Sequence, residues 1–281
     1  MPPPRKTNQH PEKTLLRNFT NITLYFFTKI INNIKTKHYY TKFGFTLAET
    51  LITIGIIGIV AAMTLPSLIQ DHREKETVAK LKKINSILSQ ALVRAINDTG
   101  TTVDQWNLEG EDSKNGSQVL VEDYFKPYFK IADDCSQLKT CIGNKKYKYL
   151  NGKEHIAYDG QNSYKHLLLA DGTLVIFHVS SGFKNCSTDA LNYYSNCADI
   201  YVDTNGYYKG PNQFGKDSFI FAMKKNRIIP YGTKREAPKF SQACNKYSSY
   251  GYDCTAWVIQ NENMDYLHCD DLDWNKKIKC K

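Results

Sequence analysis

The segment that constrains this chain most runs from Phe45 to Ile69, and its residues are apolar or small apart from one carboxylate, Glu49. About 20 residues of α-helix, at about 1.5 Å per residue, match the hydrocarbon core of a bilayer. Pro66 lies near the far end, where it removes one backbone hydrogen bond and loosens the helix locally. We therefore expect residues 45–69 to form a helix that can span a membrane.

The formal net charge of +9 is concentrated before this segment. Residues 1–44 contain eight Lys or Arg and one acid, so they supply +7 of that charge. A nucleic-acid-binding face needs basic residues clustered on a folded surface, and the rest of the sequence has no such cluster. The charge pattern therefore argues against nucleic acid as a partner. Residues 1–44 are interpreted as a processed basic leader, or as a shorter leader behind a misplaced start.

The helical pattern continues over residues 70–98, where apolar residues recur every three or four positions and the charged residues fall elsewhere. Gly100 ends the pattern. A single helix over residues 45–98 would be roughly 80 Å long. Its second half must pack on a folded domain through the apolar positions, which are Val78, Leu81, Ile84, Leu88, Ala91, Leu92 and Ala95.

Residues 99–281 predict an α+β head. A short helix is expected at QVLVEDYFKPYF (118–129), and two apolar runs about an Asp-Gly at 165–179 predict a β-hairpin. Further strands separated by turn residues are expected over 198–232, and DCTAWVIQ (253–260) is assigned to a late strand. The expected fold is thus a long helix packed on a small antiparallel sheet.

All eight cysteines lie in this head, in four close couples without a CxxC motif or zinc-ligand spacing. We expect disulfides between neighbours in sequence, although eight cysteines allow 105 pairings. Free thiols in a reducing cytoplasm are the alternative. Because basic residues flank the apolar segment on both sides, only the cysteines orient it, with the head outside the cytoplasm. The expected couples are Cys135/Cys141, Cys186/Cys197, Cys244/Cys254 and Cys269/Cys280.

Three fates are open for the apolar segment. It is a plain single-pass anchor, a secretory signal cut after the apolar run near Val60-Ala61-Ala62, or a segment that remains at the mature N-terminus after a cut before it. Glu49 bears on this choice, because an ionised carboxylate at membrane depth costs about 2.5–3.5 kcal/mol on insertion scales. A simpler explanation is that an acid in the first turn complements the helix dipole, with a gain of about 0.3–1 kcal/mol.

The sequence KFGFTLAE (42–49), followed by the apolar run, resembles the N-terminal signature of type IV prepilins and of type II secretion pseudopilins. In that family a basic leader ends in Gly, the next residue is usually Phe, and Glu is fifth after the cut. The resemblance implies that a prepilin peptidase cleaves between Gly44 and Phe45 and N-methylates Phe45. It also implies that Glu49 pairs with the new amine of a neighbouring subunit, or of its own chain, and sets the axial register of a filament.

A second stretch, VDTNGYYKGPNQFGKDSFIF (202–221), resembles the C-terminal region of pilin-like proteins. In major pseudopilins a comparable loop binds calcium, which implies oxygen ligands from Asp203, Asn205 and Asp217, with backbone carbonyls near Tyr207. The loop is not an EF-hand, because Tyr208 stands where that motif requires Gly. The alternative is a turn-rich connection whose Asp and Asn side chains cap their own backbone.

Enzymatic activity has little support, because the sequence contains no GxSxG, HExxH or phosphate-binding glycine loop. His155, His166 and His178 are scattered and are interpreted as surface or partly buried residues rather than ligands. No cofactor is expected beyond a structural calcium ion.

We therefore expect a structural pilin or pseudopilin subunit, inserted in the cytoplasmic membrane as a precursor with its N-terminus inside and its C-terminus outside, and later part of an extracytoplasmic filament. Its expected partners are prepilin peptidase, other pilin or pseudopilin subunits, and an inner-membrane assembly platform. The rival is an exported or anchored extracytoplasmic binding domain or enzyme that uses the apolar segment only as a signal or anchor.

Overall fold

The structure is a computed structural model that describes residues 46–108, 113–135, 141, 146–155, 163–179, 186, 195–247 and 249–280. The chain divides into two compact units, Met1–Ala61 and Ala62–Lys281. The expected cleavage site, Gly44 and Phe45, lies outside the described residues.

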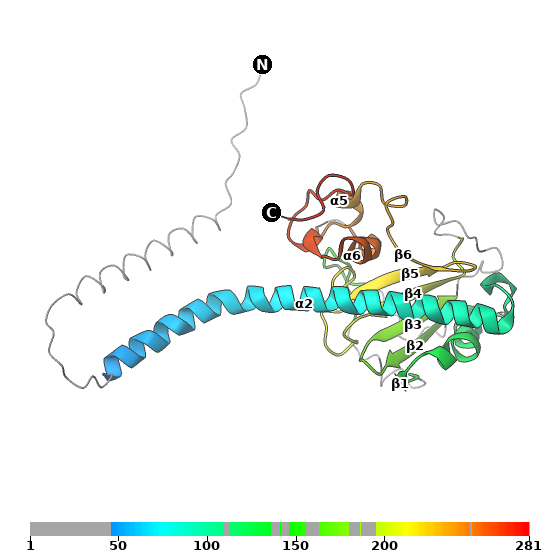
Figure 1. Ribbon diagram of the computed structural model, residues 1–281, viewed down its shortest axis with the longest axis horizontal. Coiled ribbons are helices and arrows are strands. Elements are labelled where there is room, and N and C mark those ends of the chain that lie inside the picture. Colours follow the sequence, from blue (N-terminus) through cyan, green and yellow to red (C-terminus); the bar gives the residue numbers. More distant parts are fainter. Residues whose placement is uncertain are drawn as a thin grey trace, which may run out of the picture. The chain divides into compact units, whose positions relative to one another are not determined.

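One long α-helix, α2 (Leu47–Thr99), contains both the apolar segment and the amphipathic segment (Figure 1). Among the described residues, it is the one helix long and apolar enough to cross a membrane. Pro66 lies within it. The buried residues of α2 are the seven positions expected from the sequence: Val78, Leu81, Ile84, Leu88, Ala91, Leu92 and Ala95. The predicted periodicity of the second half is therefore confirmed.

A six-stranded antiparallel sheet follows in chain order, each strand paired with the next (Figure 1). The predicted hairpin at 165–179 is confirmed, with Leu168 opposite Leu174 and Gly172 in the turn at φ +83°. The strands are β1 (Ile131–Asp133), β2 (Tyr164–Leu169), β3 (Leu174–Val179), β4 (Ala198–Asp203), β5 (Ser218–Met223) and β6 (Ile228–Pro230). The α+β class is thus as expected.

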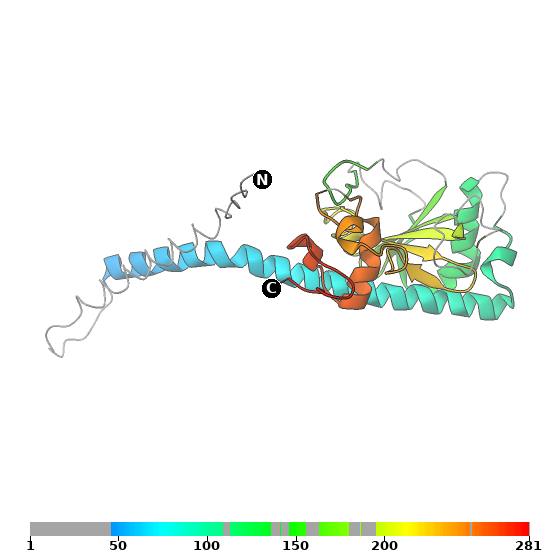
Figure 2. The ribbon, with the colours of Figure 1, turned by 90° about the horizontal axis from the view of Figure 1, so that it is seen from above.

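The amphipathic half of α2 lies on one side of this sheet (Figure 2). Leu81, Leu88 and Leu92 belong to the same buried cluster as Phe177 and Phe221 of the sheet. Burial of such side chains stabilises the fold by about 1.5–3 kcal/mol each. At the margin of this contact, Lys83 pairs with Asp171 at 2.7 Å and Lys82 pairs with Glu262.

A second, smaller cluster lies on the other face of the sheet. Leu174, Ile176 and Ile220 point to this side, where Tyr147 and Phe214 are buried with them. Side chains alternate between the two faces along a strand. The neighbouring residues of β3, Val175 and Phe177, therefore point to the face that α2 covers.

Short helical segments connect and cover the sheet. The helix expected at 118–129 is confirmed as part of a longer helical stretch before β1, made of α3 (Ser113–Val119), η2 (Leu120–Phe125) and η3 (Lys126–Tyr128). The remaining segments are η1 (Val103–Gln105), α5 (Phe240–Ala243), η6 (Tyr252–Cys254), α6 (Thr255–Asn261) and η7 (Asp265–Leu267).

The late strand predicted at DCTAWVIQ is wrong, because these residues form η6 and α6. Trp257 is fully buried in α6, stacks on Phe240 with ring centroids 3.8 Å apart, and contacts Trp274 at 4.9 Å. A short apolar run cannot be assigned to strand or helix by periodicity alone. Here the aromatic contacts from α5 and the C-terminal segment determine the outcome.

The cysteines pair as expected. The four disulfides are Cys135–Cys141, Cys186–Cys197, Cys244–Cys254 and Cys269–Cys280. Each closes a loop of 6–11 residues. Two of them, Cys244–Cys254 and Cys269–Cys280, fix the segments around α5, α6 and the C-terminal end.

Candidate functional site

The first candidate site is the apolar part of α2. None of its most apolar 18-residue window is buried within the described chain. Leu47 is 82% exposed and Ile57 is 67% exposed. An apolar surface of this extent is rare on a soluble monomer and marks a surface covered by lipid or by other chains.

The hydroxyl groups of this segment form hydrogen bonds with backbone carbonyls of the same helix. The Thr50 hydroxyl donates to the Leu47 carbonyl at 2.9 Å, and the Thr53 hydroxyl donates to the Thr50 carbonyl at 2.9 Å. The Ser67 hydroxyl donates to the Thr64 carbonyl at 2.9 Å. Internal hydrogen bonding of this kind is what a helix needs in hydrocarbon, where water cannot serve as the partner.

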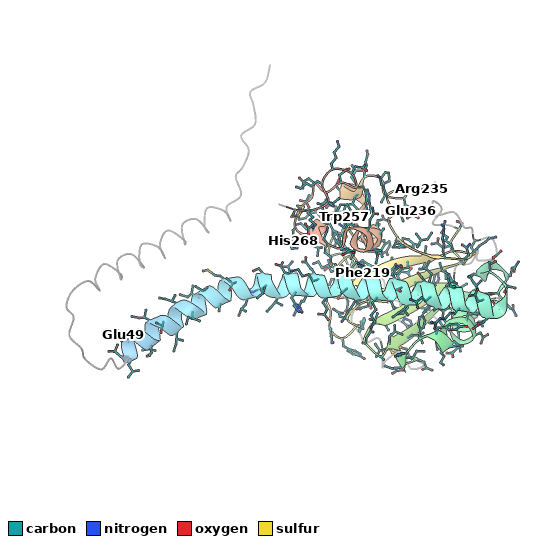
Figure 3. The ribbon with its side chains drawn as sticks, viewed as in Figure 1. Glu49, Phe219, Arg235, Glu236, Trp257 and His268 are labelled. Atoms are coloured by element: carbon teal, nitrogen blue, oxygen red, sulfur yellow. A yellow bond between two sulfur atoms is a disulfide. The ribbon has the colours of Figure 1, made fainter. Side chains whose placement is uncertain are left out.

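Glu49 lies in the first turn of α2 (Figure 3). It forms a capping box with Thr46. The Thr46 backbone N–H and hydroxyl both donate to Glu49 Oε2 at 2.9 Å, and the Glu49 N–H donates to Thr46 Oγ1 at 3.3 Å. This reciprocal arrangement satisfies backbone donors that would otherwise lack partners at a helix start. Thr46 was not predicted from the sequence, although T-x-x-E is a recognisable signal for a capping box.

The capping box leaves the charge of Glu49 without a cationic partner. In the part of the chain that the structure describes, Glu49 forms no ion pair, and its side chain is exposed. Glu49 can therefore serve both roles inferred from the sequence, stabilisation of the helix start and pairing with a cationic amine. It stabilises its own helix start, and one carboxylate oxygen remains available to an external cation.

The second candidate site is the connection between β4 and β5, where the expected calcium ligands do come together. Asn205 Nδ2 lies 3.4 Å from Asp217 Oδ2, and the Asn205 and Gly206 N–H groups donate to Asp203 Oδ1 at 3.2 and 2.9 Å. Gly206 has φ +78°, and a Cβ there would lie 2.7 Å from the Gly172 carbonyl oxygen. Glycine is therefore required for this loop to approach the β2–β3 turn.

The two carboxylates of this loop are buried and engaged by protein donors. Asp217 accepts the N–H groups of Asn212 at 2.8 Å and Gln213 at 2.7 Å, and Asp203 accepts the Tyr147 hydroxyl at 2.9 Å. These are the side-chain caps that the turn-rich alternative predicts. Burial, followed by the neighbouring Asp217 charge, raises the pKa of Asp203 to about 7.

Two amide oxygens in the same loop keep the calcium hypothesis chemically reasonable. Asn205 Oδ1 and Asn212 Oδ1 are buried and accept no hydrogen bond. Together with the spare lone pairs of Asp203 and Asp217, they form a set of hard oxygen donors of the kind calcium prefers. Asn212 and Tyr147 were not expected from the sequence, because only the folded loop brings them to the two acids.

The three histidines noted in the sequence have different surroundings. His166 is buried on β2, His178 stacks on Tyr164, and His155 contacts the Tyr149 ring edge-on at 5.0 Å. Among the described residues, one group has metal-like spacing, Asp133 with Cys135 and Cys141. Its two sulfur atoms are bonded to each other and offer no thiolate.

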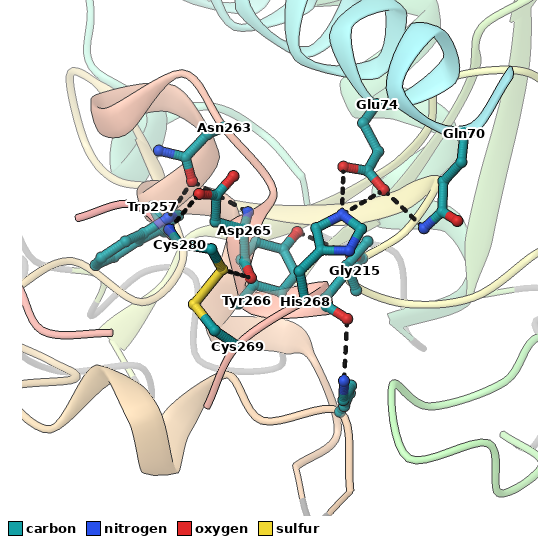
Figure 4. Close-up of polar contacts among 12 residues, drawn as sticks. Gln70, Glu74, Gly215, Trp257, Asn263, Asp265, Tyr266, His268, Cys269 and Cys280 are labelled. Atoms are coloured by element: carbon teal, nitrogen blue, oxygen red, sulfur yellow. Dashed lines mark hydrogen bonds and ion pairs between the residues drawn. A yellow bond between two sulfur atoms is a disulfide. The ribbon is translucent and has the colours of Figure 1, made fainter. Parts of the chain in front are cut away.

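A polar contact joins α2 to the C-terminal segment (Figure 4). His268 Nε2 lies 2.9 Å from Glu74 Oε2, and Gln70 Nε2 donates to Glu74 Oε1 at 3.0 Å. Nearby, the buried Tyr266 hydroxyl donates to the Gly215 carbonyl at 2.8 Å. The C-terminal segment therefore contacts both α2, through His268, and the β4–β5 connection, through Tyr266.

Comparison with known proteins finds a family for most of the chain. The profile of a family of unknown function (DUF6613) matches residues 67–280. The chain belongs to this family. No curated protein and no solved structure matches the chain.

The DUF6613 match begins within α2, next to Pro66, and extends to the last disulfide. It therefore covers the amphipathic half of the helix, the sheet and the C-terminal segment. Glu49 and the apolar run up to Pro66 lie before it.

Proposed function

We propose that this chain is a structural subunit of a filament of the type IV pilus or type II secretion pseudopilus kind. The precursor is held in the cytoplasmic membrane with its N-terminus inside and its head outside. Prepilin peptidase cleaves between Gly44 and Phe45 and methylates Phe45. The mature subunit then assembles through its N-terminal helix, with other subunits and an inner-membrane platform as partners. The subunit is not an enzyme.

The observation that carries this proposal is the contrast between the two halves of α2. From Val78 to Ala95 its apolar stripe is buried by the head, whereas no residue of the most apolar 18-residue window of α2 is buried in the described chain. A helix of this kind can exchange lipid for neighbouring helices without unfolding the head. That exchange is what a membrane precursor of a filament requires.

The charge of Glu49 supports the same proposal. Cleavage before Phe45 creates a cationic amine, and methylation keeps its charge. Each buried charge is costly alone, so a Glu49 that meets this amine on a neighbouring subunit would stabilise one axial register and disfavour others. The exposed carboxylate has no ion-pair partner within the described residues, which leaves it available.

The capping box favours one rival, a plain anchor or signal for an exported binding domain. In that case Thr46 and Glu49 would serve only to start the helix. The mature N-terminus separates the two functions. Mass spectrometry should find methylated Phe45 for a filament subunit, Met1 for an uncut anchor, and Met63 for cleavage after Ala62 by signal peptidase.

Two variants separate charge pairing from capping. Glu49→Gln keeps a capping box, because Gln serves at this position as well as Glu, but it removes the charge. Thr46→Val removes the cap and keeps the charge. For a filament subunit, Glu49→Gln should be processed normally yet assemble poorly, while Thr46→Val should still assemble. Normal assembly of Glu49→Gln would show that the carboxylate acts only as a cap.

A further inference from the structure

A cleft of about 930 Å³ lies between the start of the amphipathic part of α2 and the head. One wall is formed by α2, from Pro66 to Lys80, and the other by the β4–β5 connection and the segment after α5. Glu74, which contacts His268 (Figure 4), is one of the residues that line the cleft. All of these residues belong to the unit Ala62–Lys281.

Positive charge is in excess in this cleft. Five cations line it, Arg73, Lys80, Lys209, Lys216 and Lys246, against three acids, Glu74, Glu76 and Asp217. The acids already have partners: Glu74 contacts His268, Glu76 pairs with Lys80 at 3.0 Å, and Asp217 accepts backbone N–H groups.

Among the described residues, three of the cations have no carboxylate at ion-pair distance, although Lys209 is close enough to Glu76 to add to the effect of Lys80, which lowers the pKa of that carboxyl. In the part of the chain that the structure describes, Arg73, Lys209 and Lys216 form no ion pair. Arg73 comes from α2, and the two lysines come from the β4–β5 connection. They reach the cleft from opposite walls, which is the arrangement that surrounds an anion.

Apolar side chains also line the cleft, beside uncharged polar ones such as Gln70 and Thr77, and they favour an amphipathic anion. Pro66 and Ile69 lie on the α2 wall, and Met264 and Leu267 lie on the C-terminal wall. A small inorganic anion would gain nothing from these side chains. A ligand with a phosphate and an adjoining hydrocarbon portion would use both kinds of surface.

The sequence around the cleft places it at membrane-surface depth. Ile69 is the last residue of the apolar run and lines the cleft, and Arg73 follows four residues later. At 1.5 Å per residue, Arg73 lies roughly 6 Å beyond Ile69 along the helix. The headgroup layer on each side of a bilayer is roughly 5–8 Å thick. Arg73 is therefore at the level of the lipid phosphates when the apolar run spans the bilayer.

We propose that this cleft binds the phosphate headgroup of an anionic phospholipid. The inference rests on the membrane-held precursor of the proposed function. Bound lipid would hold the head against the membrane surface, and it would have to be released when the subunit leaves the bilayer.

The test uses the full chain in phosphatidylcholine nanodiscs that contain a photoreactive phosphatidylglycerol. After illumination, mass spectrometry should locate lipid adducts on the peptides that contain Lys209, Lys216 and Tyr247, which line the cleft. The triple variant Arg73→Gln, Lys209→Gln, Lys216→Gln should lose about tenfold or more of this labelling, because each basic residue near an anionic surface contributes about 1 kcal/mol.

The matched control is Lys130→Gln, Lys239→Gln, Lys276→Gln, which removes the same charge from exposed residues outside the cleft. It should label like the wild type. Equal labelling of the two triple variants would overturn the proposal while leaving the filament function intact. Competition by millimolar glycerol phosphate would also overturn it, in favour of a soluble anion. Failure of the chain to enter nanodiscs would overturn both proposals together.

Discussion

At the scale of single residues, Glu49 shows how one side chain meets two physical demands. Its carboxylate closes a capping box with Thr46, and this bond needs only the local chain. Its charge requires a further partner if the helix is buried among lipids or other helices. Glu49→Gln and Thr46→Val separate these demands because each removes one and keeps the other.

His166 should make the fold sensitive to acid. Burial, with a smaller effect of Lys165, lowers the pKa of His166 to about 4. Between pH 6.5 and 4 the His166 imidazole is protonated in the unfolded chain but stays neutral in the folded chain. The free energy of unfolding therefore falls as the pH drops from 6.5 to 4. The His166 contribution is at most about 1.4 kcal/mol per pH unit. Urea midpoints across this range should fall less steeply for His166→Leu than for the wild type.

The exposed His72 provides the control for this measurement. His72→Gln should reproduce the wild-type dependence of the urea midpoint on pH, because it removes a histidine from the surface and leaves the buried His166 in place. If His166→Leu also follows the wild-type curve, the buried imidazole does not cause the acid sensitivity.

Calcium should stabilise the head if the β4–β5 loop holds it. A divalent cation would offset the repulsion between the buried Asp203 and Asp217, so calcium should raise the melting temperature relative to EDTA. Each kcal/mol that calcium binding adds to the free energy of unfolding raises the melting temperature by about 2–4 °C for a domain of this size. Asp203→Asn should abolish the response, whereas Asp270→Asn, in an exposed loop, should keep it. An identical melting temperature in calcium and EDTA would leave the loop as a hydrogen-bonded turn only.

At the scale of elements, α2 combines two environments along one uninterrupted backbone. Its second half is stabilised by the sheet, and its first half presents apolar surface on all sides. Helical hydrogen bonds persist through both, because the helix satisfies its own backbone whatever surrounds it. Pro66 stands close to the change of environment, where the loss of one such bond allows local bending.

The contact between α2 and the sheet should depend on individual leucines. Leu88 is fully buried, so Leu88→Ala should lower the free energy of unfolding by about 2–5 kcal/mol. Val93 lies on the same helix and is 52% exposed, so Val93→Ala should change it by no more than about 0.5 kcal/mol. Urea denaturation of the full chain in detergent, followed by near-UV circular dichroism, measures both. Equal losses would mean that α2 does not bury this stripe.

At the scale of the whole molecule, the disulfides determine where the head can be stable. Four short loops are closed, two of them around the C-terminal segment that buries Trp257. A disulfide that closes a loop of this length contributes about 2–4 kcal/mol. Such bonds form and persist outside the cytoplasm, which agrees with a head on the far side of the membrane from the leader.

Thiol labelling in cells tests this topology. If the head is extracytoplasmic, a maleimide reagent added to denatured chain should label no cysteine before reduction and all eight after it. The expected mass difference is therefore eight labels per chain. Labelling without reductant would place the head in a reducing compartment and contradict the proposed orientation.

Local pattern by itself determined much of this protein. The apolar run, the buried stripe of α2, the Asp-Gly hairpin and the close cysteine couples all follow from spacings within a few residues, because helices, turns and short disulfide loops are local structures. Tertiary structure alone decided that DCTAWVIQ forms a helix, since Phe240 and Trp274 surround Trp257 from distant positions. It also decided that Tyr147 and Asn212 join the two buried acids and that cations from opposite walls meet in one cleft. These arrangements depend on contacts between segments far apart in the chain, which no local periodicity encodes.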